Sequence, residues 1–214
     1  MDINIFLGAP GVGKGTLAAV MAKRLGAHHV STGAMLREAV QRKTSAGLAA
    51  KGYMDRGELV PDTVLVDMMD EFLAETPTDA ILILDGFPRT VPQAEALGKL
   101  VQKHRTRITH VISLEAPESV VLDRLGGRRV CPKCGAGYHV RNIPPKVEGM
   151  CDQCNCALVT RSDDQPETIK NRLAVYEAQT APLIAWYEKA GLLRHADASP
   201  ETDVIAAAVQ KIMK

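Results

Sequence analysis

The sequence predicts an α/β fold, a doubly wound parallel sheet of five strands with helices on both faces. Short apolar runs alternate with longer amphipathic segments along the 214 residues. This alternation is typical of strand-helix-strand units, whose crossovers are right-handed. The apolar runs are nearly continuous, as expected of strands that are covered on both faces. A glycine-rich loop joins the first strand to the first helix, which predicts an anion site at that edge of the sheet.

Each strand and helix is predicted from its own run of residues. The strands are residues 3–7 (INIFL), 81–85 (ILILD), 110–115 (HVISLE) and 192–197 (LLRHAD), with residues 28–32 (HHVST) as a weaker fifth. The helices are residues 13–26, 61–74, 91–104, 117–125, 165–180 and 200–213. Several begin near Pro or Asp, and the first ends at Gly26, as helix ends commonly do. A bend is expected near Pro182.

Two segments interrupt the alternation and are predicted as inserts. Residues 31–60 are helical without a strand, and residues 127–164 contain many turn formers and four paired cysteines. The core domain is then residues 1–30, 61–126 and 165–214. A chain of this length can bury such a core without disulfides.

Composition and charge favour a soluble protein with no strongly charged partner. Apolar residues make up 46% of the chain, and 26 basic against 25 acidic residues give a net charge of +1. This balance creates no global field for nucleic acid or an anionic membrane. We expect no leader peptide, and no run approaches the roughly 18 apolar residues of a membrane helix. A cytoplasmic location is therefore expected.

The run GAPGVGKGT, residues 8–16, is predicted to bind phosphate. It nearly fits the pattern G-x-x-x-x-G-K-[ST], but Gly15 replaces the usual hydroxyl residue and Thr16 follows one place later. Its backbone N–H groups would surround a polyphosphate, and Lys14 would add a positive charge. The alternative is a glycine-rich turn without a ligand, which the flanking strand and helix disfavour.

Two further runs follow predicted strands at the edge where an open sheet binds ligands. ILILDGFPRT ends a buried strand at Asp85, whose carboxylate could order the water shell of Mg²⁺, and brings Arg89 into the next turn. STGAMLR brings Thr32 and Arg37 after the second strand. Taken alone, the first run is equally compatible with a turn-capping Asp, and the second is better explained as a capped helix start.

In this order the three runs resemble the adenylate kinase family of nucleoside monophosphate kinases, whose fold is of the P-loop NTPase type. The resemblance continues through MDRGELVPD, DRLGGRRV, GYH, PPKVEG, TRSDD and RLAVYEAQTAPL. It implies reversible phosphoryl transfer from MgATP to AMP, which gives two ADP. It also implies that residues 31–60 are an AMP-binding insert and residues 127–164 a zinc-binding lid. We expect ATP, AMP and ADP as partners, no nucleic acid or membrane partner, and a monomer.

The resemblance assigns roles to the residues that match the motifs of the family. The catalytic residues would be Lys14, Asp85, Arg89, Arg124, Arg128, Arg161 and Arg172. The ATP site would comprise Gly11, Val12, Gly13, Lys14, Gly15, Thr16, Arg124, Arg128, Gly137, Tyr138 and Ser199. The AMP site would comprise Thr32, Arg37, Glu58, Leu59, Val60, Gly86, Phe87, Pro88, Arg89, Gln93, Arg161 and Arg172. Thr32 and Gln93 are the matches that favour adenine.

Phosphate chemistry agrees with these roles. Phosphoryl transfer needs alignment and dispersal of charge over phosphate oxygens, and the fork of donors on arginine suits that task. A phosphate whose second pKa is near 6 is already ionised at neutral pH, so no general base is required. The six histidines are therefore interpreted as structural or surface residues. Two positions depart from the family: Ala34 replaces an acid, and the run at Ser199 lacks a lysine.

The cysteines predict a structural metal centre. CPKC and CDQC form C-x2-C-x16-C-x2-C, a spacing typical of tetrahedral zinc, and four thiolates leave no open position. Cys156 could replace one ligand at poorer spacing, and His139 is a weaker substitute. Gly135 and Asn155 tolerate the left-handed turn that a metal knuckle needs. Iron and cobalt also bind thiolates. The predicted ligands are Cys131, Cys134, Cys151 and Cys154.

Two other functions stay open at this stage. One is a kinase for another nucleoside monophosphate, or one that uses GTP. The other is a regulatory zinc-ribbon protein that binds nucleotide without turnover. A nucleic-acid-binding ribbon is poorly supported, because Tyr138 is the one aromatic residue of the insert.

Overall fold

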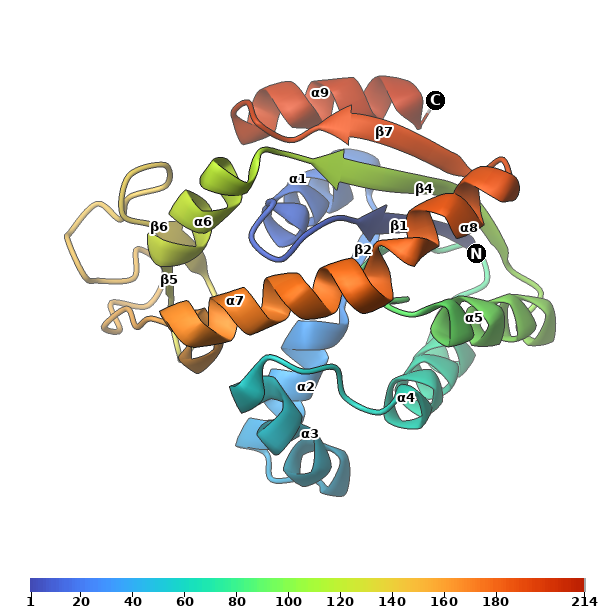
Figure 1. Ribbon diagram of the computed structural model, residues 1–214, viewed down its shortest axis with the longest axis horizontal. Coiled ribbons are helices and arrows are strands. Elements are labelled where there is room, and N and C mark those ends of the chain that lie inside the picture. The colour runs from blue at the N-terminus through green and yellow to red at the C-terminus, as the bar shows by residue number, and fades with distance from the viewer. Residues whose placement is uncertain (214) are drawn as a thin grey trace.

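A five-stranded sheet forms the centre of the molecule (Figure 1). The computed structural model describes residues 1–213. The strands are β1 (Asp2–Leu7), β2 (His28–Ser31), β3 (Ile81–Asp85), β4 (Arg107–Glu115) and β7 (Leu193–Asp197). They are all parallel and lie in the order β2-β3-β1-β4-β7. The predicted parallel sheet is confirmed, and so is its weaker fifth strand.

Helices cover both faces of this sheet, as a doubly wound fold requires. They are α1 (Lys14–Leu25), α2 (Thr32–Gln41), α3 (Ser45–Arg56), α4 (Asp62–Glu75), α5 (Val91–Lys103), α6 (Glu118–Gly126), α7 (Pro166–Val175), α8 (Pro182–Lys189) and α9 (Thr202–Ile212). Side chains alternate between the two faces of a strand. Ile3 and Ile5 of β1 accordingly pack with apolar residues of α4, α5 and α8, whereas Phe6 packs with those of α1 and α9.

The two buried clusters make the sheet a rigid support for the loops at its edge. Ile3, Ile5, Leu82 and Ile83 are fully buried, and Phe6 is 1% exposed. Burying one such side chain contributes roughly 1.5–3 kcal/mol. The loops that leave the carboxyl ends of β1 and β3 therefore begin from well-packed positions.

Local sequence explains where several helices begin and end. Gly26 adopts a left-handed φ of 63° and ends α1, while Thr90 caps α5 by accepting a hydrogen bond from the Gln93 N–H at 3.2 Å. The bend expected near Pro182 begins earlier than predicted. Tyr176–Thr180 form a π-helical turn between α7 and α8, and α8 starts at Pro182. Proline cannot donate to the preceding turn, so the chain widens before it.

The two predicted inserts differ in structure. Residues 31–60 form the packed helices α2 and α3, which lie together below the sheet in Figure 1. Residues 127–164 form a small antiparallel ribbon of β5 (Arg128–Val130) and β6 (Gly137–His139), a long loop and the 3-10 turn η1 (Ser162–Asp164). Among residues 1–213, we find no helix with the length and apolar character needed to cross a bilayer.

Candidate active site and metal centre

A large cleft lies at the carboxyl ends of β1, β2, β3 and β4. It is lined by the loop after β1, by residues of α2 and α3, and by residues 128–143 and 159–163. Its volume is about 2420 Å³. Pockets for a single small ligand seldom exceed roughly 1,000 Å³. The cleft therefore has room for two nucleotides.

Most of the predicted nucleotide-binding residues line this one cleft. They are Gly11, Val12, Gly13, Lys14, Gly15, Thr16, Thr32, Arg37, Glu58, Leu59, Val60, Asp85, Gly86, Pro88, Arg89, Arg124, Arg128, Gly137, Tyr138, Arg161, Arg172 and Ser199. Phe87 and Gln93 lie beneath its surface, with exposed fractions of 1% and 0%. For these two residues, and for all those that line the cleft, contact with a nucleotide stays a prediction.

The loop between β1 and α1 depends on glycine at two close approaches. Gly8 has a φ of 140°, and a Cβ there would lie 2.5 Å from the carbonyl oxygen of Leu114. Gly11 has a φ of 86°, and its Cβ would lie 2.5 Å from Cγ of Leu125. Other residues strain at such φ values and collide with these neighbours. The glycines thus let the loop fold closely over β4 and α6.

Lys14 begins α1 and its ammonium group lies inside this loop. Nζ donates hydrogen bonds to the carbonyl oxygens of Gly8 at 2.7 Å and Ala9 at 2.9 Å. Burial lowers the pKa of Lys14 to about 7, although the charge of Asp85 opposes that shift. A bound anion would favour the protonated form, so Lys14 is suited to meet a phosphate oxygen.

Asp85 ends β3 beside the phosphate loop, and His29 on neighbouring β2 contacts it. His29 Nε2 lies 3.4 Å from Asp85 Oδ2. Burial raises the pKa of Asp85, but the His29 hydrogen bond and the charge of Lys14 outweigh burial and leave that pKa below its ordinary value. A Cβ on Gly15 would lie 3.2 Å from Asp85 Oδ2. Gly15 therefore leaves room for an ionised carboxylate at the entrance of α1.

Arginines from separate segments of the chain line this cleft. Burial is the largest cause that lowers the pKa values of Arg37, Arg89 and Arg161, the last to about 10. Neighbouring arginines, including Arg128 and Arg172, lower these values further. Arg161 Nε is buried without a hydrogen-bond partner among residues 1–213. Such mutual repulsion would be relieved by a polyanion.

Asp163 and Asp164 fix the positions of two cleft arginines, Arg128 and Arg172. Arg128 Nε donates to Asp164 Oδ2 at 2.7 Å, and Arg172 Nη1 lies 3.0 Å from Oδ atoms of both aspartates. The Asp164 side chain is fully buried. Neither aspartate was predicted from the sequence as a site residue. The adjacent acids of TRSDD, between two predicted phosphate-binding arginines, are the signal that could have found them.

The loop after β3 has its own hydrogen-bond network. Thr32 Oγ1 donates to the carbonyl oxygen of Gly86 at 2.8 Å, and Arg89 Nε donates to the same oxygen at 3.0 Å. Gln93 accepts from the Arg89 N–H at 2.7 Å and donates to Asp62 Oδ1 at 2.6 Å. The amide of Gln93 is thus engaged by the protein, and the contribution of Asp62 was not predicted.

Arg124 connects the phosphate loop to the loop after β7. Its Nη1 donates to the carbonyl oxygens of Val12 at 2.8 Å and Ala198 at 2.7 Å, and its Nη2 to those of Ser199 and Pro200, each at 3.2 Å. Contact between Arg124 and a donor phosphate stays a prediction. The observed bonds fix the loop that carries Ser199 beside the predicted donor site.

Several charged side chains form ion pairs with neighbouring residues. Glu58, predicted to contact AMP, forms an ion pair with Arg56 at 2.7 Å. Arg24 and Arg42, to which the sequence motifs assign no role, pair with Asp203 at 2.6 Å and Glu38 at 3.4 Å. Both arginines lie on the surface.

The four predicted cysteine ligands form one cluster. Their sulfur atoms all lie within 4.8 Å of one another, with 3.4 Å between Cys131 and Cys154, 3.5 Å between Cys134 and Cys151, and 3.7 Å between Cys134 and Cys154. A tetrahedron with Zn–S bonds of roughly 2.3 Å has edges of about 3.8 Å. The thiols are therefore spaced to bind one tetrahedral metal ion.

The turns around this cluster follow the sequence prediction. Gly135 has a φ of 75° and Asn155 a φ of 52°, so the residue after each cysteine pair is left-handed as expected. Cys156 lies outside the group of four. His139 accepts from the N–H groups of Arg141 and Asn142, and its Nε2 lies 3.2 Å from a backbone oxygen. Neither predicted substitute belongs to the cluster.

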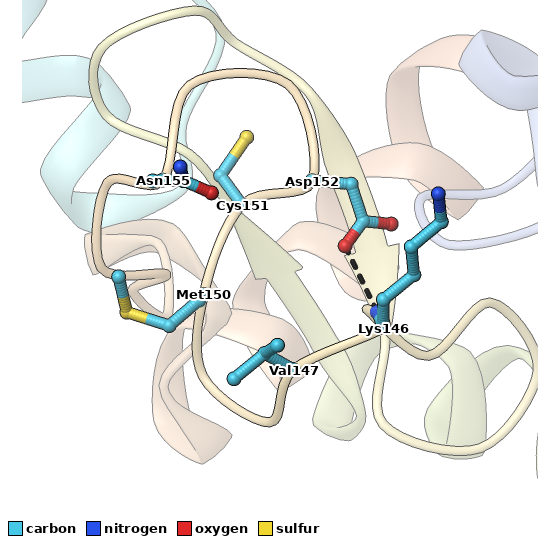
Figure 2. A pocket seen from close by; sticks show the side chains of 6 residues that line it. All are labelled: Lys146, Val147, Met150, Cys151, Asp152 and Asn155. Carbon is cyan, nitrogen blue, oxygen red and sulfur yellow. Dashed lines mark hydrogen bonds between the residues drawn. The ribbon is translucent and has the colours of Figure 1, made fainter.

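A small pocket lies beside the second cysteine turn, and Figure 2 shows the side chains that line it. A cavity of about 280 Å³ is lined there by residues that include Lys146, Cys151 and Asp152. The Lys146 N–H donates to Asp152 Oδ1 at 2.9 Å, the contact drawn in Figure 2. This bond joins the loop before the turn to the turn itself.

Comparison with known proteins gives a consistent match. The family model described as adenylate kinase matches residues 6–192. The chain is similar to an adenylate kinase of Citrifermentans bemidjiense, at 56% identity over 193 residues that cover 90% of each chain. It is also similar to adenylate kinases of Carboxydothermus hydrogenoformans, at 47% identity over 98% of each chain, and Enterococcus faecalis, at 46% over 98% of this chain and 97% of the relative.

Proposed function

The chain belongs to the adenylate kinase family and is an ATP:AMP phosphotransferase, and we propose that its cleft aligns MgATP and AMP for reversible phosphoryl transfer. The observation that carries the proposal is the convergence of Lys14 and several half-buried arginines on a cleft large enough for two nucleotides. This arrangement supports phosphate binding on both sides of one transfer path.

The donor phosphates would lie in the loop of residues 11–16. Backbone N–H groups at the start of α1 and the Lys14 ammonium provide positive potential there. Arg128 and the loop at Ser199 would contact the rest of ATP. Arg124 donates hydrogen bonds to four carbonyl oxygens. These bonds hold the loop at Ser199 against residue 12.

AMP would lie between α2, α3 and the loop after β3. Arg37 and Arg89 are half-buried in that part of the cleft, and this burial lowers their pKa values. A phosphate would supply the missing counter-charge. Thr32 is 2% exposed and already donates to Gly86, so its effect on adenine selectivity would come through packing and this bond.

Arg161 and Arg172 would stabilise charge on the transferred group. Phosphoryl transfer has little need for a general base, because the attacking phosphate oxygen is already ionised. Arg172 is oriented by Asp163 and Asp164, which reduces the cost of aligning it when nucleotides bind. The catalytic contribution is therefore alignment and charge stabilisation.

Magnesium would enter with ATP and neutralise charge on its phosphates. Asp85 fits a water-mediated role, since its carboxylate is ionised, half-buried and next to Gly15 of the phosphate loop. Carboxylates often contact Mg²⁺ through its retained waters. His29 would keep the Asp85 carboxylate in place.

We also propose that residues 31–60 and 127–164 move as inserts on the core of residues 1–30, 61–126 and 165–214. Closure would exclude water that could otherwise accept the phosphoryl group. The four-thiol cluster would bind zinc and stabilise residues 127–164. A cytoplasmic monomer is the simplest form of such an enzyme.

A substrate panel tests the proposed specificity. Initial rates with AMP, CMP, UMP and GMP as acceptors, each with ATP and with GTP, should be highest for ATP with AMP. Preference for CMP or UMP would contradict the argument from Thr32, because related CMP and UMP kinases usually have Ala at that position. Nucleotide binding without any turnover would support the regulatory zinc-ribbon alternative.

A further inference from the structure

Tyr138 of β6 directs its hydroxyl group toward the cysteine cluster. The hydroxyl oxygen lies 3.5 Å from Cys151 Sγ and accepts a hydrogen bond from the Asp152 N–H at 2.8 Å. The residue is 8% exposed and packs with Cys131 and Cys151 in one small buried cluster. The family resemblance gives Tyr138 only a contact with the donor nucleotide.

The direction of the hydrogen bond to sulfur follows from these contacts. A tyrosine hydroxyl has one proton to donate and can accept at the same time. Because the Asp152 N–H already donates to the oxygen, the hydroxyl proton is free to point toward Cys151. A thiolate that binds metal has no proton of its own, so it can only accept.

We propose that Tyr138 is a positioning residue of the metal centre and donates a hydrogen bond to the Cys151 thiolate. Four thiolates around a divalent ion leave an excess of negative charge. A hydrogen bond to one of them disperses part of that charge and fixes the direction of the sulfur lone pairs. The Asp152 N–H in turn fixes the hydroxyl.

Burial makes this contact more important for Cys151 than for its neighbours. Cys151 is 0% exposed, so solvent does not hydrogen-bond its sulfur atom while Tyr138 is in place. Cys134 is exposed and can be hydrogen-bonded by solvent. Loss of the tyrosine hydroxyl would therefore leave the Cys151 sulfur without this hydrogen-bond donor, whereas solvent can still donate to Cys134.

This inference rests on metal binding by the four cysteines and not on phosphoryl transfer. Substitution of the hydrogen-bonding partner of a metal ligand typically weakens metal affinity roughly 10- to 100-fold. Tyr138→Phe removes the hydroxyl and keeps the ring. Tyr187→Phe is the matched control, because Tyr187 is 3% exposed and its hydroxyl has no hydrogen-bond partner among residues 1–213.

The first test measures zinc affinity by competition with a colorimetric chelator, and the sulfur-to-metal charge-transfer band after Co²⁺ substitution. We expect Tyr138→Phe to bind zinc about 10- to 100-fold more weakly and to shift the cobalt band to lower energy. Tyr187→Phe should match the parent in both measurements. Parent-like affinity and an unshifted band in Tyr138→Phe would overturn the proposal.

A second test uses the parent chain in case Tyr138→Phe does not fold. With cadmium-113 in the site, the Tyr138 hydroxyl proton should exchange slowly and show scalar coupling to the metal through Cys151. Absence of that coupling in a cadmium-loaded protein would contradict the hydrogen bond. A parent chain that binds no metal would defeat both this inference and the metal centre, but would leave the kinase activity untouched.

Discussion

The phosphate loop and the cysteine ribbon both consist of tight turns that depend on left-handed residues, but different forces stabilise them. The phosphate loop lies on two extensive buried clusters that enclose both faces of the sheet. The cysteine ribbon, by which we mean β5, β6 and the loop that carries Cys151 and Cys154, has a much smaller buried cluster. Among the described residues, its fully buried members are only Cys131, Tyr138 and Cys151. Two of these three residues are predicted metal ligands, so the ligands are themselves most of the core of the ribbon.

The conformations of these two regions of one enzyme therefore depend on different interactions. Packing determines the conformation of the phosphate loop, and its charges can then act on a ligand without first ordering the chain. The ribbon is too small to bury a sufficient apolar core, so metal binding would provide much of its folding free energy. A substitution in one region, or removal of the metal, should therefore change the conformation of that region and leave the other region unchanged.

The largest effect is expected from the charge inside the packed loop. Lys14→Ala should lower kcat at least roughly 10²- to 10³-fold, since one preorganised donor at a reacting group is lost. Circular dichroism and the urea midpoint should change little, because packing supports the loop. Lys23→Ala, on the exposed side of α1, is the control and should keep parent kinetics. A Lys14→Ala variant with parent kcat would refute the role of this ammonium group.

The next largest effect concerns the metal. Cys151→Ser should reduce the zinc content of the purified protein from about one per chain, expected for a four-thiolate site, to a small fraction. Cys156→Ser should leave the content unchanged, because Cys156 lies outside the cluster. Mass spectrometry of the native protein measures both. Zinc loss in Cys156→Ser but not in Cys151→Ser would reverse the ligand assignment.

A smaller effect is expected where residues 31–60 pack closely against α7. Gly57 has a φ of 72°, and a Cβ there would lie 2.7 Å from Cγ of Arg172. Gly57→Ala should cost about 1–2 kcal/mol of stability from the left-handed backbone, and should lower kcat/KM by displacing Arg172. Gly98→Ala is the control, since Gly98 lies inside α5 with open space around it. Urea unfolding should show Gly98→Ala as stabilising by roughly 0.5–1 kcal/mol; equal stability of the two variants would contradict this account.

The smallest effect lies at the edge of the sheet, away from both sites. His195 Nδ1 contacts Glu115 at 2.6 Å and Nε2 contacts Glu188 at 3.4 Å, and the hydrogen bond to Glu115 raises the pKa of His195. A raised pKa stabilises the fold at low pH, and that contribution disappears as pH rises through the pKa of the folded state. His195→Gln should therefore be less stable than the parent near pH 6 and equal to it near pH 9. A destabilisation that does not change with pH would indicate packing instead.

Local sequence patterns predicted most of the fold, and they predicted which residues gather in the cleft and in the cysteine cluster. The strands, the phosphate loop, the cysteine ligands and the left-handed Gly135 and Asn155 all follow from spacing or from backbone preferences within a few residues. The π-helical turn before Pro182 was located less well, because a proline indicates a break without fixing on which side the chain adjusts.

Contacts between distant residues could not be predicted in the same way. His29 and Asp85 are 56 positions apart and meet only because β2 and β3 are neighbours in the sheet. The hydroxyl of Tyr138 turns toward Cys151 because β6 packs on the second cysteine turn. Periodicity indicates which residues are buried, but it does not identify the partner of a buried polar group.

Amide hydrogen exchange of the zinc-loaded and the chelator-treated protein tests the contrast between the two regions most directly. Chelation should remove protection from amides of residues 131–156, whereas amides of α1 and of β1, β3 and β4 should keep theirs. Equal loss of protection in both regions would show that the metal stabilises the whole fold. Unchanged protection of the ribbon after complete metal removal would show that the metal does not stabilise it.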